Sequence, residues 1–253
     1  MYRLEGKVAL VTGASGAIGH DISIALANAG ADIIAAGRNL DRLQDTADMV
    51  RKCGRKCLII TADISQSEEP KRIFEECYEA FERVDIVINN AGTNVSKEAG
   101  RFTEGEFDLI VNTNLKGPFL LSQLFAEKMK TGNGGNIIFI TSQLGKIAML
   151  YQCLYGATKA ALMQITRSLA LEWARYNIRV NSVSPGPWSK GMSEPLLQNR
   201  KIKEALTHMT PTHRLGREGD IGGAVIFLAS NAAQHITGQD LIVDGGFSIC
   251  KII

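Results

Sequence analysis

The stretch KVALVTGASGAIG, residues 7–19, decides the fold of this chain. Its first part is apolar and β-rich, and a glycine-rich turn then leads into an alanine-rich helical pattern that ends near Gly30. Glycines let the backbone turn tightly and approach a pyrophosphate, whose charge meets the free amides at the helix's amino end. A glycine cluster alone would indicate only a turn, but strand, turn and helix in this order predict a nucleotide site. Its candidate contacts are Gly13, Ser15, Gly16, Ile18 and Gly19.

Strands and helices alternate along most of the chain. Further strands are predicted at residues 32–36, 56–61, 85–89, 137–140, 178–182 and 240–243. Helical patterns lie at residues 40–53, 67–81, 102–130, 153–173 and 220–230. The alternation predicts an α/β fold, a single Rossmann-like domain over residues 1–253 with a doubly wound parallel sheet and helices on both faces. Ligands are expected at the carboxyl ends of its strands.

Length and composition narrow the class of partner. A chain of 253 residues that is 45% hydrophobic can bury a substantial core as one domain. Its net charge of +2, without long runs of like charge, argues against nucleic acid or an anionic membrane as the partner and favours a small molecule. The first apolar run is too short for a signal peptide, and no apolar span reaches the ~20 residues of a membrane helix. A soluble, cytoplasmic protein is expected.

The five cysteines are odd in number and form no C-x-x-C pair. They are therefore predicted to be free thiols, and neither a disulfide framework nor a metal site is expected. One of them, Cys153, lies two residues before Tyr155. It is predicted to be a small buried side chain, with a place in a pocket wall as the alternative.

Tyr155 and Lys159 lie four residues apart in a predicted helix, so their side chains emerge on one face. A fixed positive charge beside a phenol favours the phenolate and lowers its pKa from about 10. Tyr155 is therefore a candidate general acid or base. Ser142, thirteen residues upstream at a strand end, is the candidate that orients the same substrate oxygen. Without the glycine turn, this spacing would indicate only a packed ring beside a solvated amine.

Arg38 follows the second predicted strand, where the adenosine ribose of a dinucleotide is expected. An acid there would bond the ribose hydroxyls and repel a 2′-phosphate, whereas an arginine suits bidentate phosphate contact. NADP(H) is therefore favoured over NAD(H), which remains possible, and a solvated loop arginine is the alternative. Asp63, at the end of the third strand, is predicted either to bond the adenine edge or to cap the helix that begins near Ser67.

Small or polar residues mark further candidate positions. Asn90, Ala91 and Gly92 follow the fourth strand and either allow a ligand close to the backbone or form only a turn. Asn114 lies inside an apolar helical pattern, where its amide needs a hydrogen-bond partner or a water-filled site.

Two prolines in three positions, Pro185 and Pro187, are predicted to stop regular structure around Gly186. Residues 188–214, called the lid segment below, are predicted to form a loop or lid over the substrate. Trp188 is expected to contribute to the apolar side of this lid.

Taken together, these motifs resemble the classical short-chain dehydrogenase/reductase family over essentially the whole chain. They are residues 12–19, Asn89 to Gly92, Asn114, Ser142, Tyr155 with Lys159, and Pro185-Gly186. The resemblance implies that Tyr155 exchanges a proton with the carbonyl or alcohol oxygen, which Ser142 orients. It also implies that Lys159 binds the nicotinamide ribose and lowers the tyrosine's pKa, and that Asn114 holds a water in the proton relay.

Two positions depart from the family's pattern. The family's middle glycine is matched by Ala17, with Gly16 one residue earlier, and the added methyl group should have a mild effect. The threonine that often contacts the nicotinamide amide is matched by Lys190, with Ser189 as a possible substitute.

The resemblance implies an NADP(H)-dependent oxidoreductase that transfers a hydride between nicotinamide and a ketone or secondary alcohol. Within the family, a reductase of 3-oxoacyl thioesters is favoured, with a substrate that acyl carrier protein can carry. The alternatives are a gluconate or other sugar-acid dehydrogenase and, in another class, a non-catalytic nucleotide-binding regulator. By analogy with the family, the protein is expected to form a homotetramer or homodimer through its long helices.

Overall fold

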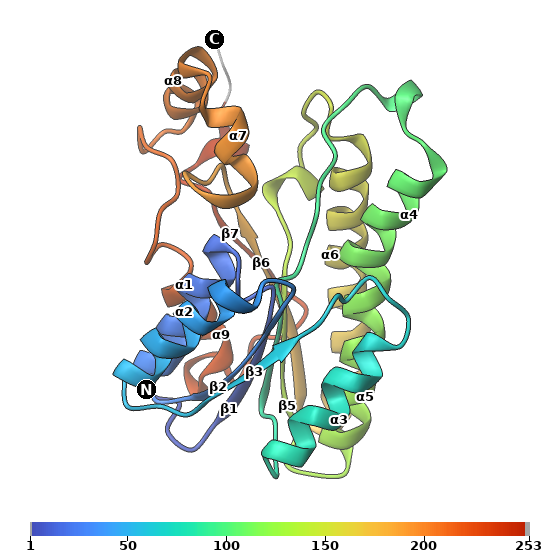
Figure 1. Ribbon diagram of the computed structural model, residues 1–253, viewed down its shortest axis with the longest axis vertical. Coiled ribbons are helices and arrows are strands. Elements are labelled where there is room, and N and C mark those ends of the chain that lie inside the picture. Colours follow the sequence, from blue (N-terminus) through green and yellow to red (C-terminus); the bar gives the residue numbers. More distant parts are fainter. Residues whose placement is uncertain (1, 251–253) are drawn as a thin grey trace.

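The computed structural model describes residues 2–250, which form a seven-stranded sheet with helices on both faces (Figure 1). The strand order is β3-β2-β1-β4-β5-β6-β7, and every neighbouring pair is parallel. The strands are β1 Val8–Thr12, β2 Asp32–Gly37, β3 Cys57–Thr61, β4 Ile86–Asn89, β5 Gly135–Ile140, β6 Ile178–Pro185 and β7 Asp240–Val243. The predicted doubly wound α/β fold is confirmed.

The helices are α1 Ala17–Asn28, α2 Leu40–Lys52, α3 Glu69–Ala80, α4 Glu104–Val111, α5 Gly117–Lys130, α6 Cys153–Trp173, α7 Glu194–Leu197, α8 Arg200–Met209 and α9 Gly222–Ala229. Two layers of these helices, α1, α2 and α9 on one face and α3, α5 and α6 on the other, cover the sheet. The alternating side chains of each strand separate into two apolar cores. In β1, Ala9 and Val11 join the core under α1, α2 and α9, whereas Val8 and Leu10 join the core under α3, α5 and α6. Figure 1 shows these two layers on opposite sides of the sheet.

Two predicted elements have different bounds in the structure. The helical pattern at residues 102–130 is interrupted by a π-helical turn, Asn112–Lys116, between α4 and α5. Strand β6 continues three residues beyond residue 182 and ends at Pro185, which pairs with Val243. Pro185 is tolerated because it is the last residue of the strand.

The lid segment was expected to be a loop, but it carries the short 3₁₀ turn Gly191–Ser193 and the helices α7 and α8. Asn199 caps α8 through its side chain, which accepts hydrogen bonds from the amides of Lys201 and Ile202. Trp188 is buried in the core beside α9 and therefore belongs to the sheet layer rather than to the lid's surface.

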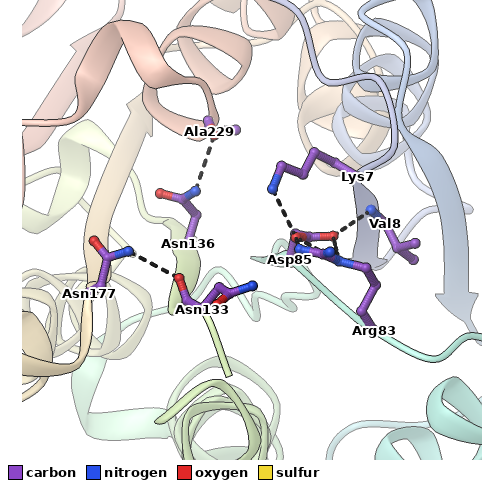
Figure 2. Close-up of polar contacts among 8 residues, drawn as sticks. All are labelled: Lys7, Val8, Arg83, Asp85, Asn133, Asn136, Asn177 and Ala229. Carbon is purple, nitrogen blue, oxygen red and sulfur yellow. Dashed lines mark hydrogen bonds and ion pairs between the residues drawn. The ribbon is translucent and has the colours of Figure 1, made fainter. Parts of the chain in front are cut away.

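Polar side chains are hydrogen-bonded to one another at the end of the sheet where the strands begin (Figure 2). The buried carboxylate of Asp85, just before β4, accepts hydrogen bonds from the Val8 amide at 3.0 Å and from Lys7 Nζ at 3.1 Å. Arg83 pairs with the same carboxylate. Asn136 donates to the Ala229 carbonyl at 3.1 Å. These contacts tie the strand starts to each other and to α9.

None of the helices formed by residues 2–250 is both long and apolar enough to span a membrane.

Candidate active site

One long cleft of about 1050 Å³ runs along the carboxyl ends of the strands. Its wall contains every predicted cofactor and catalytic residue except Asn114. These are Gly13, Ser15, Gly16, Ile18, Gly19, Arg38, Asp63, Asn90, Ala91, Gly92, Ser142, Tyr155, Lys159, Pro185 and Gly186. Residues from six strand ends therefore meet in one cleft, as parallel strands require.

The glycine turn and the segment after β4 are held together by hydrogen bonds. Thr12 Oγ1 accepts from the amides of Asn90 and Ala91 at 3.0 and 3.1 Å, and Asn90 Nδ2 donates to the Thr12 carbonyl at 2.9 Å. Gly13 has φ +65°, and a Cβ there would lie 2.9 Å from the Ala91 Cα. A Cβ on Gly19 would overlap the Gly13 carbonyl. Glycine is required at both positions because the backbones touch.

The amino end of α1 fits the diphosphate of a dinucleotide. Its N-cap residue, Gly16, gives the first amides no side-chain partner, and the first turn holds no acidic residue. These amides and the helix dipole favour a bound anion. Ala17 begins the helix, so the departure from the family's glycine leaves this amino end intact.

Arg38 lies exposed in the cleft wall after β2, and Arg42 joins it from the first turn of α2. The two guanidinium groups are therefore on the side of the cleft where an adenosine ribose is expected. Arg42 was not predicted, although its spacing of four residues from Arg38 at a helix start could have indicated it.

Asp63 does not cap α3, contrary to one of its two predicted roles. Its Oδ1 accepts from the amide and hydroxyl of Ser65 at 3.1 and 2.8 Å, whereas α3 begins later, after Glu68. Asp63 lines the cleft, so the other role, contact with the adenine edge, stays a prediction.

Asn114 lies fully buried in the π-helical turn, behind the cleft wall. Its Oδ1 accepts from the Thr93 amide at 2.7 Å, and its Nδ2 donates to the Thr93 carbonyl at 2.9 Å and to Thr158 Oγ1 at 3.2 Å. The widened turn thus presents one amide to both α6 and the segment after Gly92. A π-helical turn in this position is a common feature of functional sites.

Tyr155, Ser142 and Lys159 converge where β5 and α6 meet. All three side chains line the cleft. Lys159 Nζ lies 5.6 Å from the centroid of the Tyr155 ring and donates to the Ile140 carbonyl at 2.8 Å. Lys159 is only 3% exposed, so its ammonium is held by the protein and not by bulk water.

The pKa of Tyr155 is shifted upward, contrary to the predicted decrease. Burial raises this pKa because it disfavours the phenolate, and the Ser142 hydroxyl acts in the opposite direction. Burial also lowers the pKa of Lys159 to about 8. The sequence shows the spacing of Tyr155 and Lys159 but not how far the protein shields them from water. This shielding determines the direction of the pKa shifts here.

A family model described as enoyl-(acyl carrier protein) reductase matches residues 13–248. The chain belongs to the short-chain dehydrogenase/reductase family. Among its relatives in this family is a 2-dehydro-3-deoxy-D-gluconate 5-dehydrogenase of Dickeya dadantii, which is 36% identical over 97% of each chain. A tropinone reductase homolog of Arabidopsis thaliana is also 36% identical, over 98% of this chain and 94% of that protein.

One of the similar solved structures holds both a coenzyme and a small acid. It is a gluconate 5-dehydrogenase of Burkholderia cenocepacia in complex with NADP and tartrate. It is 31% identical, with a TM-score of 0.94 over 99% of this chain and 98% of that chain. Family membership makes this chain an oxidoreductase, and the predicted preference for 3-oxoacyl thioesters has less support than the sugar-acid alternative.

A buried carboxylate beside the catalytic segment was not predicted. Asp240 accepts from Ser182 Oγ at 2.6 Å and Ser184 Oγ at 2.8 Å, and pairs with Lys146 Nζ at 3.0 Å. Burial acts to raise its pKa, but these hydrogen bonds hold the net pKa below the ordinary value. Asp240 also accepts from Thr141, the residue before Ser142. The end of β5 is thereby fixed to β6 and β7.

Two single-residue predictions have different outcomes. All five cysteines are free thiols, as predicted. Cys153, however, is exposed and borders a small hollow with Phe102 and Phe107, so its predicted burial is wrong. Cys153 is the first residue of α6, and its side chain lies at the surface rather than on the buried face of the helix.

Lys190 points its ammonium at Glu218, at 2.7 Å, in an exposed ion pair. It also lines the cleft, at the position where the family often has threonine. The ion pair joins the start of the lid segment to the segment before α9, which the sequence pattern did not indicate.

Proposed function

We propose that this protein is an NADP(H)-dependent dehydrogenase that interconverts a secondary hydroxyl and a keto group on a sugar acid. The observation that carries the proposal is the 36% identity, over 97% of both chains, to a 2-dehydro-3-deoxy-D-gluconate 5-dehydrogenase. A second relative with that name, from Escherichia coli, is 34% identical over the same share of each chain. Both match the chain from end to end, including the segments that line the cleft.

In the proposed reaction, the nicotinamide coenzyme accepts or donates the hydride. Tyr155 takes the proton from the substrate hydroxyl in oxidation and returns it to the oxygen in reduction. Ser142 donates a hydrogen bond to that oxygen and sets its distance from the phenol. The buried Lys159 ammonium favours the phenolate at the moment when the proton leaves Tyr155. Asn114 fixes the segment after Gly92, which forms the adjacent wall.

The coenzyme preference rests on charge at the adenosine end of the cleft. Arg38 and Arg42 line this end, and no acidic residue ends β2. Two guanidinium groups suit a 2′-phosphate, whereas an acid would repel it. The gluconate 5-dehydrogenase of Burkholderia cenocepacia and another related structure hold NADP. We therefore propose NADP(H) as the preferred coenzyme.

A matched substrate panel tests the proposal. D-gluconate and 2-dehydro-3-deoxy-D-gluconate are assayed with NADP⁺ and NAD⁺, and a 3-oxoacyl thioester is assayed with NADPH and NADH. We expect the highest kcat/KM for a sugar acid with NADP⁺. Higher kcat/KM for the thioester would reject the sugar-acid assignment and favour the second candidate, an acyl-thioester reductase, which the family model's description supports. Coenzyme binding without turnover of either class would favour a non-catalytic regulator.

A further inference from the structure

A row of polar side chains lines the cleft at the amino end of α6, close to Tyr155. Asn94 Nδ2 donates to Gln152 Oε1 at 2.8 Å, and Gln152 Nε2 donates to Ser96 Oγ at 3.1 Å. Gln152 is the N-cap residue of α6 and lies three residues before Tyr155. We call Asn94, Ser96 and Gln152 the polar wall. All three line the cleft, and none has a role in the reaction proposed above.

The polar wall has an unsatisfied acceptor. Asn94 Oδ1 is buried and accepts no hydrogen bond from any residue that the structure describes. Gln143 follows Ser142 directly, is only 3% exposed, and also has a buried Oε1 that has no partner within residues 2–250. Gln143 lines the same cleft. Buried polar atoms in folded proteins are nearly always hydrogen-bonded, so two orphan oxygens in one binding cleft indicate donors on a ligand.

The charge of the cleft shows which kind of donor fits. Its cationic side chains, among the residues described, are Arg38, Arg42, Lys159 and Lys190. The first two lie at the adenosine end, Lys159 donates to Ile140, and Lys190 pairs with Glu218. The polar wall itself is uncharged. It therefore suits neutral hydroxyl groups, which both donate and accept, rather than a carboxylate.

We propose that the polar wall determines specificity by binding the hydroxyl groups that flank the reacting carbon of a polyhydroxylated substrate. The inference rests on the proposed function and deepens it. Asn94 Oδ1 accepts from one such hydroxyl, while Gln152 holds the Asn94 amide in the orientation that leaves this oxygen free. An apolar acyl chain in the same place would leave Asn94 Oδ1 and Gln143 Oε1 unpaired, which disfavours it.

The test compares two substrates of equal chain length. D-gluconate and 5-hydroxyhexanoate both have six carbons, a carboxylate and a hydroxyl at carbon 5, but only gluconate has hydroxyls at the neighbouring carbons. The ratio of their kcat/KM values is measured for the wild type, for Asn94→Leu and for Gln152→Met. These replacements keep the approximate size of the side chain and remove its hydrogen bonds. Gln164→Met is the matched control, because Gln164 is exposed on the same helix, away from the cleft.

We expect each wall variant to lower the gluconate to hydroxyhexanoate ratio about tenfold, the effect of losing one well-placed hydrogen bond. Gln164→Met should keep the wild-type ratio. A general structural defect would lower both kcat/KM values together and leave the ratio unchanged. An unchanged ratio in both wall variants, with gluconate still oxidised by the wild type, overturns the inference and leaves the proposed function standing.

A second pair of probes separates the two proposals if the wild type oxidises no sugar acid. The pair is 2,3-butanediol and 2-butanol, which differ by one hydroxyl next to the reacting carbon. A preference for the diol that Asn94→Leu removes supports the polar wall and rejects the sugar-acid function. Equal use of both alcohols by the wild type overturns the polar wall as well.

Discussion

Polar side chains are paired differently at the amino and carboxyl ends of the strands. At the end of the sheet where the strands begin, the Asp85 carboxylate is paired with Lys7 and Val8 at the start of β1 and with Arg83 just before β4 (Figure 2). At the carboxyl ends of the strands, Lys159 is buried and has no acidic partner among residues 2–250, and within the same residues Asn94 and Gln143 keep unpaired oxygens. The first arrangement lowers the free energy of the folded state, whereas the second spends some of that stability to hold groups ready for a ligand.

The largest expected effect comes from Tyr155→Phe, which removes the phenol and keeps the ring. General acid-base catalysis contributes about 10²- to 10⁴-fold, so we expect kcat to fall by that range. Coenzyme affinity, measured by NADPH fluorescence titration, should change little because the ring and Lys159 remain. The melting temperature should stay close to that of the wild type. Turnover near the wild-type rate would remove Tyr155 from the proposed mechanism.

The candidate site residues lie at the carboxyl ends of the strands, and the sequence predicts some of them better than others. Tyr155 and Lys159 are readable because a helix places residues four apart on one face. Gly13 and Gly19 are readable because only a turn between strand and helix needs them there. Local spacing thus supplied both the fold and the core of the candidate site.

Contacts between distant segments could not be predicted in this way. Gln152 meets Asn94 across 58 residues, and Asp240 meets Thr141 across 99. Neither pairing leaves a periodic signal, because it depends on how strand ends meet in space. The sequence shows Lys159 beside Tyr155 but not how far the surrounding protein shields the two groups from water, so the direction of the tyrosine's pKa shift was predicted wrongly.

The second prediction concerns the stability cost of Lys159. Burial lowers its pKa from 10.5 in the unfolded chain to about 8 in the folded protein. Between these values the unfolded chain binds more protons, so the free energy of unfolding rises with pH. The cost of burying the charge is full below pH 8 and is relieved as pH increases toward 10.5. The shift corresponds to roughly 3 kcal/mol, as an order of magnitude.

Denaturant unfolding at pH 7 and pH 9.5, for the wild type and Lys159→Met, measures this effect. Both pH values lie below the ordinary pKa of tyrosine, so Tyr155 contributes little to the change in stability between them. The wild type should gain stability relative to the variant as pH rises. Lys159→Met should be at least as stable as the wild type at pH 7, while losing activity. A constant difference between the two proteins across this range would mean that Lys159 is not strained by its burial.

The smallest expected effect comes from Asp85→Asn at the end of the sheet where the strands begin. Asparagine keeps the size and one acceptor for the Val8 amide, but it loses the charge that Lys7 and Arg83 pair with. Hydrogen bonds to charged groups contribute about 1.5–3 kcal/mol, and the half-exposed partners reduce this, so we expect a loss of about 1–2 kcal/mol. Asp48→Asn, which breaks an exposed pair with Arg51, is the matched control and should cost less than about 0.5 kcal/mol.

Kinetic measurements on Asp85→Asn test whether the two ends of the strands act independently. Asp85 lies at the start of β4, whereas Asn90 and the cleft follow its end, so the rigid strand separates the two. We expect kcat and coenzyme affinity of Asp85→Asn to stay within about twofold of the wild type at temperatures where it is folded. A variant with wild-type stability and reduced kcat would show that the strand start influences the cleft. The two ends of the strands would then be coupled, and the ion pairs of Asp85 would contribute to catalysis.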